Sequence, residues 1–480
     1  MPARRPRVVP ARAHDDLTES LAQLRTELDL QAGFPAEVEA EAQQAVRSVP
    51  TEPAAAQLDD LRDIEFLTID PAGSTDLDQA LHLERTATGA VLQYAIADLP
   101  AFVAPGGAVD GEARLRGQTL YAADGRIPLH PVALSEDAAS LLPGRERRAF
   151  VWRFVLDDGA RPVETTLRRA VIRSRAQWTY VDAQAAIDTG TAPEALRALA
   201  WFGPLRRERE AERGGVSLNV PQARIVADDH GYRLEREAPL AIEDWNAQAS
   251  LLTGMAAAEL MLRGGVGILR TMPAAEPDDI TAFRAQTVAL GIPWPRDVSY
   301  GDYLRSLDRD LPAALAILDA AAGLFRGAGY VAFDGDPPAD PLQAAIGAPY
   351  AHATAPLRRL VDRWSLVTCE ALANGREVPE WVREALPTLP KIMARSDGVA
   401  NRLDAATLDR VEAALLSRHE GQVFEAVVLG RRNDGARVQL TDPPVTAKVT
   451  GLDAAPGETV HLRLTRTSIA TGTIVLEPTA

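Results

Sequence analysis

Hydrophobic residues recur with different spacings along the chain, and the changes in spacing divide it into four stretches. Leucines at 17, 21, 24 and 28 follow helical spacing, so a helix is expected over 16–28 and a second over 35–46. From about 60 to 180 the pattern alternates in short runs, such as 91–98, which is typical of strands. From about 190 to 420 helical spacing dominates. Helices are expected over 192–212, 241–263, 276–290, 311–326, 356–374 and 402–418.

After Gly421 the pattern alternates again in five short runs, separated by turns that contain Asp-Gly, Pro-Pro and Pro-Gly. Five short strands in this space predict a small OB-type barrel. Such barrels usually stack nucleic-acid bases on exposed aromatic side chains, and only Phe424 is available here. The alternative is a small β-barrel without RNA contact. The runs are 422–429, 436–440, 445–449, 459–464 and 473–476.

The stretch 64–81 carries the first candidate chemistry. Its apolar run 64–69 predicts a short buried strand that ends on Asp70, and Pro71 and Gly73 then break the strand. Asp76 and Asp78 follow two residues apart, which places them on one side of an extended chain. Three carboxylates so arranged repel one another, and a divalent cation with oxygen ligands such as Mg²⁺ removes that cost. The alternative is a polar loop in which these aspartates cap turns.

A second stretch, 350–363, combines a helix start with positive charge. Thr354 is a suitable N-cap and Pro356 a suitable first-turn residue. Backbone N–H groups at that helix start, with Arg358 and Arg359 one turn in, predict an anion site. The alternative is that the arginines pair with acids such as Asp362. His352 is interpreted as a hydrogen-bonded structural histidine.

Composition narrows the class of protein. The chain has 480 residues, a net charge of −16 and a single cysteine, Cys369, which excludes an internal disulfide and a thiolate cluster for zinc. No apolar run approaches the ~20 residues of a membrane span, and no apolar segment follows the basic N-terminus as in a secretory signal. We therefore expect a cytoplasmic protein without a membrane partner. The acidic balance argues against RNA binding over the whole surface, but a positive channel remains compatible with it.

Both motif stretches resemble the RNB-domain exoribonucleases, the ribonuclease II and ribonuclease R family. The first resembles T-I-D, a short loop and D-x-D-D-A; the second resembles Y-x-H-x-T-S-P-I-R-R-Y-x-D, with Ala355 and Leu360 as departures. Blocks between them also match, so the resemblance covers about 60–480. It implies an α+β fold: an RNB catalytic domain over 59–419, with a mixed sheet and surrounding helices, and an S1-like OB-type barrel over 420–480.

The resemblance also implies what precedes the catalytic domain. Larger relatives carry cold-shock-type RNA-binding domains there. Residues 1–58 show no comparable β-rich stretch, so we expect a tail and a short helical segment in their place.

By resemblance, the function is a Mg²⁺-dependent, hydrolytic 3′→5′ exoribonuclease that releases nucleoside 5′-monophosphates from single-stranded RNA. Asp70 and Asp76 would be metal ligands, and Asp78 would orient water or metal as a catalytic residue. Arg358 would offset charge in the transition state. The residues expected to bind RNA are Tyr121, on the terminal base, Tyr180, on the ribose, Arg358 and Arg359.

This chain departs from the family pattern at several positions. Gln79 stands where the family has an acidic metal ligand, which predicts a higher Mg²⁺ requirement or a preference for Mn²⁺. If strand alternation holds from 76 to 83, however, Gln79 points away from Asp78 and is structural. Leu218 replaces an aromatic partner in the base stack, Asn246 lies where the family has an acidic pair, and Thr407 lies where some relatives have a glutamate.

Two rival functions remain open from the sequence. The first is an RNB-fold protein that binds RNA for regulation and cleaves it weakly or not at all, which Gln79, the reduced base stack and the acidic surface favour. The second is a phosphodiesterase that acts on DNA or on a small nucleotide. We expect a monomer in every case.

Overall fold

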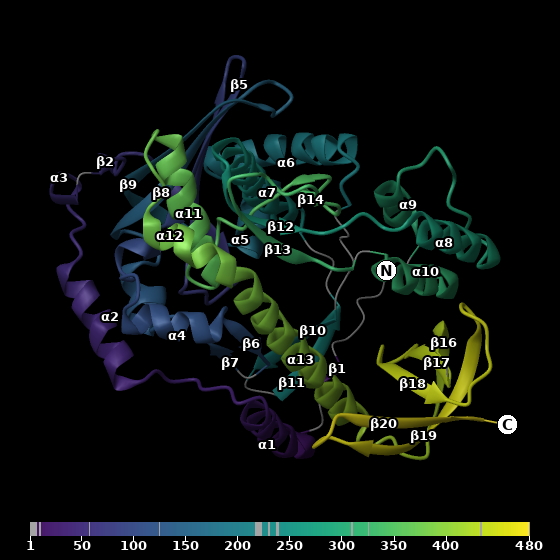
Figure 1. Cartoon of the computed structure of the whole chain (residues 1–480). Coiled ribbons are helices and arrows are strands. Elements are labelled where there is room, and N and C mark those ends of the chain that lie inside the picture. Colours follow the sequence, from purple (N-terminus) through teal and green to yellow (C-terminus); the bar gives the residue numbers. More distant parts are fainter. Residues whose placement is uncertain are drawn as a thin grey trace.

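The structure is a computed structural model, and its elements are shown in Figure 1. The described residues are 7–8, 11–56, 58–123, 125–216, 223–228, 231–236, 240–308, 311–324, 326–432 and 434–479. The helices are α1 (Ala11–Glu27), α2 (Ala36–Ser48), α3 (Pro53–Ala56), α4 (Ala108–Arg116), α5 (Tyr180–Asp188), α6 (Glu194–Glu212), α7 (Ala241–Gly264), α8 (Pro277–Ala289), α9 (Tyr300–Ser306), α10 (Pro312–Ala322), α11 (Leu360–Ala373), α12 (Glu380–Ala385) and α13 (Leu389–Leu416).

A mixed sheet with the strand order β2-β9-β3-β4-β5-β8 forms the centre of the catalytic part. Strand β9 is 18 residues long and pairs with β8 as well as with β3, so the sheet closes on itself. The pairing of β3 with β9 is parallel, and β4, β5 and β8 are antiparallel to their neighbours. Its strands are β2 (Asp59–Asp60), β3 (Phe66–Asp70), β4 (Gln79–Thr86), β5 (Gly89–Ala97), β8 (Glu146–Leu156) and β9 (Pro162–Thr179).

Both faces of this closed sheet are covered, which explains the nearly continuous apolar run in β5. Leu92, Tyr94 and Ile96 pack into one hydrophobic cluster with residues of α6 and α7. Ala95 and Ala97 face a second cluster, which contains Val38 of α2. Because successive side chains of a strand point to opposite faces, a strand buried on both faces carries few polar residues.

Smaller pairs of strands and the C-terminal barrel complete the fold. Hairpin β6–β7 and the pairs β10–β11, β12–β13 and β14–β15 are antiparallel. The bounds are β1 (Arg7–Val8), β6 (Leu120–Ala122), β7 (Gly125–Ile127), β10 (Ala223–Asp228), β11 (Gly231–Arg236), β12 (Val266–Thr271), β13 (Gly329–Asp334), β14 (Leu342–Gln343), β15 (Ala348–Pro349), β16 (Val423–Arg432), β17 (Gly435–Leu440), β18 (Thr446–Thr450), β19 (Thr459–Ser468) and β20 (Thr473–Pro478).

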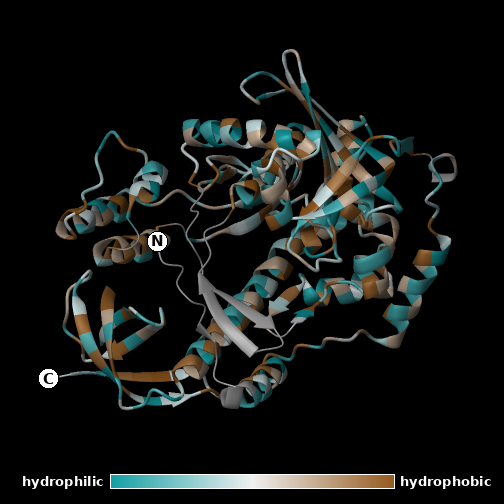
Figure 2. Cartoon of the chain, turned by 180° about the vertical axis from the view of Figure 1, so that it is seen from behind, coloured by the Kyte–Doolittle hydropathy of each residue, from teal (hydrophilic) through white to brown (hydrophobic). Residues whose placement is uncertain are grey.

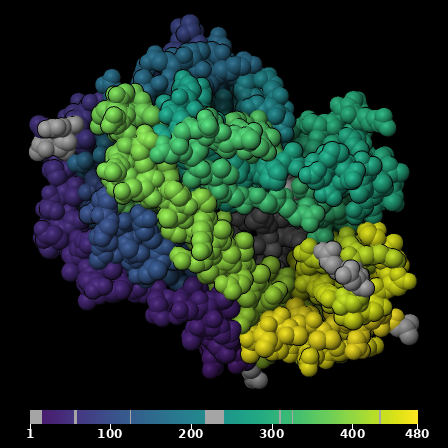
Figure 3. All heavy atoms as spheres, in the orientation of Figure 1, coloured from purple at the N-terminus to yellow at the C-terminus, as the bar shows by residue number. Residues whose placement is uncertain are grey.

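The barrel has the strand order β18-β17-β16-β19-β20, and its two edge strands lie against each other, so it is nearly closed. Figure 3 shows it beside the helices α8–α10 and the end of α13. Arg437 of β17 forms an ion pair with Asp319 of α10, which ties the barrel to the catalytic part. The predicted α+β fold with a C-terminal S1-like barrel is confirmed. The exact domain boundaries at 59 and 420 stay predictions.

Helix α13 starts earlier than predicted and runs diagonally from the catalytic part to the barrel (Figure 1). The predicted start at 402 was wrong because Gly398 and its polar neighbours weaken the helical signal. Tertiary contacts hold the earlier turns, such as the hydrogen bond from Ser396 Oγ to the Arg116 carbonyl at 3.0 Å. Helix α1 packs on the other end of α13, where Arg410 Nε donates to Ser20 Oγ at 3.0 Å.

The predicted helix over 356–374 also needs correction, because α11 begins at Leu360. Thr354 is therefore not its N-cap, and Pro356 lies before the helix. Figure 2 shows hydrophilic and hydrophobic residues mixed on the outer helices, and no helix in the described part of the chain is long and apolar enough to cross a membrane.

Gly254 of α7 allows the second motif to approach the helix closely. A Cβ atom at this position would lie 2.7 Å from the Ala351 carbonyl and 2.1 Å from Tyr350 Cε2. We expect Gly254→Ala to lower the free energy of unfolding by about 1–3 kcal/mol, because the backbone must move. Gly398→Ala is the matched control, since a Cβ at Gly398 of α13 meets nothing within 4 Å. It should stabilise the protein by up to about 1 kcal/mol. Urea unfolding of both variants checks this, and an equal effect of the two would contradict it.

Candidate active site

The parallel pairing of β3 and β9 places the first carboxylate beside the first aromatic residue. Asp70, the last residue of β3, lies opposite Thr179, the last residue of β9. The chain then enters α5 at Tyr180, with Thr179 Oγ accepting from the Asp182 backbone N–H at 3.0 Å. Asp70 and Tyr180 therefore meet at the carboxyl ends of two parallel strands.

A cavity of about 600 Å³ opens at this edge. The loop after β3, hairpin β6–β7, the start of α5 and the second motif all contribute to its wall. The functional side chains that line it are Asp70, Asp76, Gln79, Tyr121, Arg126, Tyr180 and Arg358. The structure therefore brings together most of the predicted site residues, although the two motifs lie far apart in the sequence.

Asp78 has a different position from the one predicted. Its side chain is 3% exposed and does not line the cavity. One oxygen accepts from the Leu357 backbone N–H at 2.8 Å and the other from Arg358 Nε at 3.2 Å. Burial raises the pKa of Asp78 above its usual value, and the Arg358 guanidinium opposes that rise. Asp78 thus holds the second motif in place.

The predicted convergence of three carboxylates is therefore wrong. In the part of the chain that the structure describes, no group of three or more His, Cys, Asp or Glu is arranged to share a metal ion. The alternation argument for Asp76 and Asp78 fails because 71–78 is an irregular loop, in which successive side chains need not alternate. Asp70 and Asp76 are the two carboxylates that face the cavity.

Arg359 does not reach the cavity either. Its guanidinium forms an ion pair with Asp362, which is fully buried. Asp362 also accepts from the backbone N–H groups of Thr354 and Ala355, at 2.8 Å each. Asp362 therefore folds the turn before α11 back over the helix start and occupies the N–H groups expected to form an anion site. The pairing alternative describes Arg359, whereas Arg358 remains half-exposed and lines the cavity.

Asp70 differs from Asp76 and Asp78 in its contacts. Within the described residues, no hydrogen bond or ion pair is formed by its side chain. Burial raises its pKa to about 6, the nearby Arg358 lowers it and Asp76 raises it further. An ionised carboxylate that is mostly buried without a partner is costly, and a bound cation removes that cost. Asp70 and Asp76 thus form a donor pair of the kind that Mg²⁺ uses, together with water and substrate phosphate.

Gln79 faces the cavity rather than the core. Its Nε2 donates to the Thr354 carbonyl, which links β4 to the second motif. Because the nitrogen is engaged, the amide oxygen is the atom left to face a cation. As alternation predicts, the side chains of Gln79 and Asp78 point in different directions. The cavity, however, lies on the side of Gln79. The interpretation of Gln79 as a metal ligand stays a prediction.

Tyr121 projects from hairpin β6–β7 with 52% of its surface exposed. The segment before the hairpin pairs with the second motif, where the Thr119 N–H donates to the Arg358 carbonyl at 2.9 Å. Partial desolvation of its phenol group raises the pKa of Tyr121 to about 12. An exposed ring beside the arginine and the carboxylates is available for stacking on a base.

Sequence reasoning missed Arg126. It lies opposite Tyr121 in the hairpin, and its guanidinium forms an ion pair with Asp76. The same group donates to Thr75 Oγ at 2.7 Å and pairs with Glu136 at 2.7 Å. A hairpin interpretation of 120–127 would have placed Arg126 across from Tyr121, but no local signal identifies its acidic partners.

The other departures fall in different places. Asn246 lies beside Tyr180, with Nδ2 3.5 Å from the phenolic oxygen. Thr407 is buried on α13 and does not line the cavity. Leu218 lies outside the described residues. His352 is half-buried, with Nδ1 2.7 Å from the Tyr330 hydroxyl, and desolvation lowers its pKa well below the usual value, in keeping with a structural histidine.

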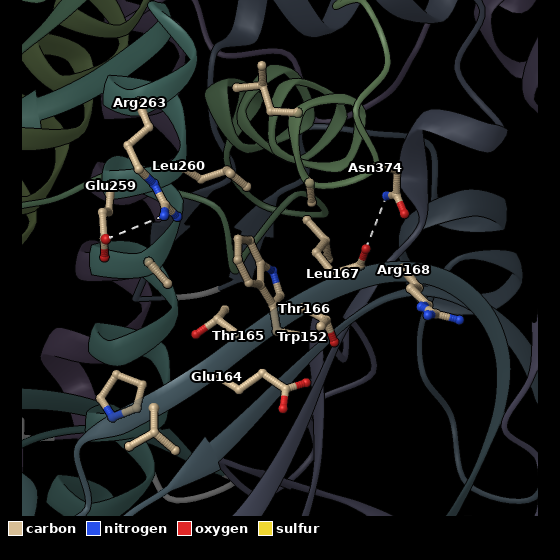
Figure 4. Close-up of a pocket in the computed structure, with 15 residues that line it drawn as sticks. Trp152, Glu164, Thr165, Thr166, Leu167, Arg168, Glu259, Leu260, Arg263 and Asn374 are labelled. Atoms are coloured by element: carbon tan, nitrogen blue, oxygen red, sulfur yellow. Dashed lines mark hydrogen bonds and ion pairs between the residues drawn. The ribbon is translucent and has the colours of Figure 1, made fainter.

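A separate cavity of about 510 Å³ lies between β8, β9, α7 and the end of α11. Figure 4 shows Arg263 beside Glu259 on its rim, and Asn374, whose amide donates to the Leu167 carbonyl at 3.1 Å. None of the predicted site residues lines it, whereas several of them line the cavity at Asp70.

Family models and known proteins agree with this architecture. The model of the RNB domain matches 58–365, and the model of the RNase II-type exonuclease C-terminal S1 domain matches 422–479. The chain is 29% identical to the exosome complex exonuclease RRP44 of Mus musculus over 63% of this chain and 33% of that protein. It is 25% identical to ribonuclease R of Thermotoga maritima over 81% of this chain and 57% of that protein. The chain thus spans about a third and somewhat more than half of these relatives.

Among solved structures, RNase R of Mycoplasma genitalium in complex with ribose methylated single-stranded RNA matches with a TM-score of 0.85 at 17% identity, over 97% of this chain and 78% of that one. Yeast Ssd1, a pseudonuclease, matches with a TM-score of 0.65 at 15% identity, over 86% of this chain and 54% of that one. At these identities the likeness concerns the fold. Because the RNB model covers well over half of the chain, this protein belongs to the RNB family and carries an RNase II-type C-terminal S1 domain.

Proposed function

We propose that this protein is a Mg²⁺-dependent, hydrolytic 3′→5′ exoribonuclease that shortens single-stranded RNA and releases nucleoside 5′-monophosphates. The observation that carries the proposal is the cavity at Asp70. It combines a carboxylate pair suited to a divalent ion, the half-exposed Arg358 and the exposed ring of Tyr121. Membership of the RNB family supports RNA as the substrate, and relatives named as exonucleases support the reaction.

The residues fit a Mg²⁺ ion, because Asp70 has no partner among the described residues and Mg²⁺ needs only one or two protein carboxylates. Asp70, Asp76 and the amide oxygen of Gln79 would hold it, and Mn²⁺ suits the mixed ligand set as well. When bound, the ion would supply charge for activating water and for stabilising the leaving oxygen. Without a full charge on Gln79, we expect a higher metal requirement than a third carboxylate would give.

The remaining residues act on the RNA. Arg358 would contact the scissile phosphate, where its guanidinium offsets charge that develops in the transition state. Asp78 is a positioning residue in this scheme, since it contacts Arg358 and the Leu357 N–H instead of the cavity. Tyr121 would stack on the 3′-terminal base and Tyr180 would contact its ribose. The cytoplasmic location and the monomeric state stay predictions from the sequence.

A second candidate function is RNA binding without cleavage. The observation that favours it is the ion pair between Arg126 and Asp76, which already supplies a positive charge to one of the two cavity carboxylates. The likeness of the fold to yeast Ssd1, which is described as a pseudonuclease, supports the absence of cleavage in this candidate.

One experiment separates these functions. The purified protein is incubated with 5′-labelled single-stranded RNA in Mg²⁺, in Mn²⁺ and in EDTA, with DNA of the same sequence in parallel. Stepwise shortening from the 3′ end with release of 5′-monophosphates, seen with a metal ion but not in EDTA, supports the exoribonuclease function. RNA that is bound but not shortened supports the second candidate. Equal cleavage of DNA would contradict a specificity for RNA.

We expect Asp78→Asn to lower turnover about 100-fold or more while the fold persists, because an amide cannot hold the Arg358 guanidinium in place by charge. Arg358→Lys should also lower turnover more than RNA affinity, because lysine lacks the planar fork. If Asp78 acts through Arg358, the double variant loses little more than the worse single variant.

Single-turnover rates and RNA affinities of the three variants measure this coupling. Asp59→Asn is the matched control, since Asp59 forms an exposed pair with Arg168 at 3.2 Å. Fully additive losses, or turnover of Asp78→Asn within twofold or so of the wild type, would remove Asp78 from this role.

Tyr121→Ala should lengthen the shortest RNA product, because short RNAs depend most on a single stacking contact worth about 1–3 kcal/mol. Tyr121→Phe keeps the ring and should leave the end product unchanged. Product lengths on a sequencing gel measure both variants. An alanine variant with the wild-type end product would contradict the stacking role.

A further inference from the structure

Arg126 connects the aromatic hairpin to the carboxylate loop. Its guanidinium contacts three groups at once: the Asp76 carboxylate, the Glu136 carboxylate and the Thr75 hydroxyl. Thr75 Oγ also donates to Glu136 at 2.7 Å, which completes a small network. Because Tyr121 lies directly across the hairpin, these contacts hold the stacking ring over the cavity.

The contacts of the site also set its charge. Asp76 and Glu136 pair with Arg126, and Asp78 pairs with Arg358. Asp70 is the acid of the cavity for which the described residues show no cationic partner, so it is open to a divalent ion.

The two arginines of the site differ in their position relative to the cavity. Arg358 pairs with Asp78, whose carboxylate does not line the cavity. Arg126 pairs with Asp76, whose carboxylate does line it. A divalent ion between Asp70 and Asp76 would therefore have Arg126 as its nearest fixed positive charge on the Asp76 side. The ion and the guanidinium repel each other while they share one carboxylate.

We propose that Arg126 is a positioning residue that couples the metal ligands to the base-binding hairpin, and that it holds one oxygen of Asp76 in competition with the divalent ion. The inference rests on the proposed metal-dependent function. In this role Arg126 lowers the affinity for the metal ion and raises the affinity for RNA. The ion and Arg126 compete for the Asp76 carboxylate. A stronger contact between Asp76 and the ion weakens the contact between Asp76 and Arg126, and the hairpin that carries Tyr121 is then held less firmly.

The opposite signs separate this role from a purely structural one. Removing the guanidinium charge should tighten metal binding by about tenfold, the size expected for one partly exposed charge beside a divalent ion. The freed Asp76 also becomes more mobile, which offsets a smaller part of that gain. RNA binding without metal should weaken by about threefold or more, because the hairpin that carries Tyr121 loses its tether. A merely destabilised site would weaken both.

The test uses the full chain with the variants Arg126→Gln and Arg126→Lys. Mn²⁺ binding without RNA is measured from the electron paramagnetic resonance signal of the free ion. RNA binding is measured in EDTA by the fluorescence anisotropy of a labelled oligoadenylate. Arg168→Gln is the matched control, because Arg168 pairs with Asp59 on the exposed side of β9. We expect tighter Mn²⁺ and weaker RNA binding for Arg126→Gln, near-wild-type Mn²⁺ binding for Arg126→Lys, and no change for Arg168→Gln.

Glu136→Gln provides a second test that does not remove Arg126. It frees the guanidinium from one of its two acids, so Arg126 concentrates on Asp76 and Mn²⁺ binding should weaken several-fold. If Arg126→Gln and the wild type gave superimposable Mn²⁺ binding curves, the proposed role of Arg126 would be overturned while the proposed function stood. If Arg126→Gln does not fold, superimposable curves for Glu136→Gln and the wild type would have the same consequence. A wild-type protein that binds no Mn²⁺ would overturn the metal site of the proposed function and this inference with it.

Discussion

The buried carboxylate of Asp78 joins the two halves of the site, and the rest of the active-site geometry depends on it. It binds the Leu357 N–H and the Arg358 guanidinium, which come from a motif about 280 residues further along the chain. The Asp78 carbonyl accepts in turn from the Ala97 N–H at 2.9 Å, so the residue is fixed within the sheet. Losing one partner of such a buried pair leaves the other without compensation, which makes the contact costly to disturb.

Burial and partners divide the aspartates of the site into two classes. Asp78 and Asp362 are fully enclosed, and backbone N–H groups and arginines occupy their oxygens. They shape the turn that precedes α11, and their lone pairs are committed. Asp70 and Asp76 face the cavity, and Asp70 has no partner among the described residues. Only the second class can offer oxygens to a cation, so the division follows from hydrogen bonding rather than from residue type.

The closed sheet explains why aromatic rings gather at the same edge. The parallel register of β3 and β9 ends both strands together, and the chain turns there into the loop of Asp76 and into α5 with Tyr180. Hairpin β6–β7 reaches the same edge because its preceding segment pairs with the backbone of Arg358. Acidic, basic and aromatic groups thus meet on short elements anchored to a rigid sheet, an arrangement that keeps a site precise.

Local pattern was sufficient for much of the fold. The spacing of apolar residues located α6, α7 and α8 to within a few residues, and alternation located the five strands of the barrel. These elements follow from the chain itself, since each buries one regular face. The starts of α11 and α13 did not follow. Asp362 folds back the turn before α11 through the Thr354 N–H, and Ser396 anchors the early turns of α13 to the distant Arg116 carbonyl.

The same distinction applies to the site. The sequence by itself determined which residue types could form it. The two motifs named Asp70, Asp76 and Arg358, and the resemblance of the block between them named Tyr121. Only the tertiary structure decided how they are arranged. It turned Asp78 inward and Gln79 outward, paired Arg359 with Asp362 and brought Arg126 onto Asp76. The reason is physical: an irregular loop has no fixed period, so the direction of each side chain depends on hydrogen-bond partners far along the chain.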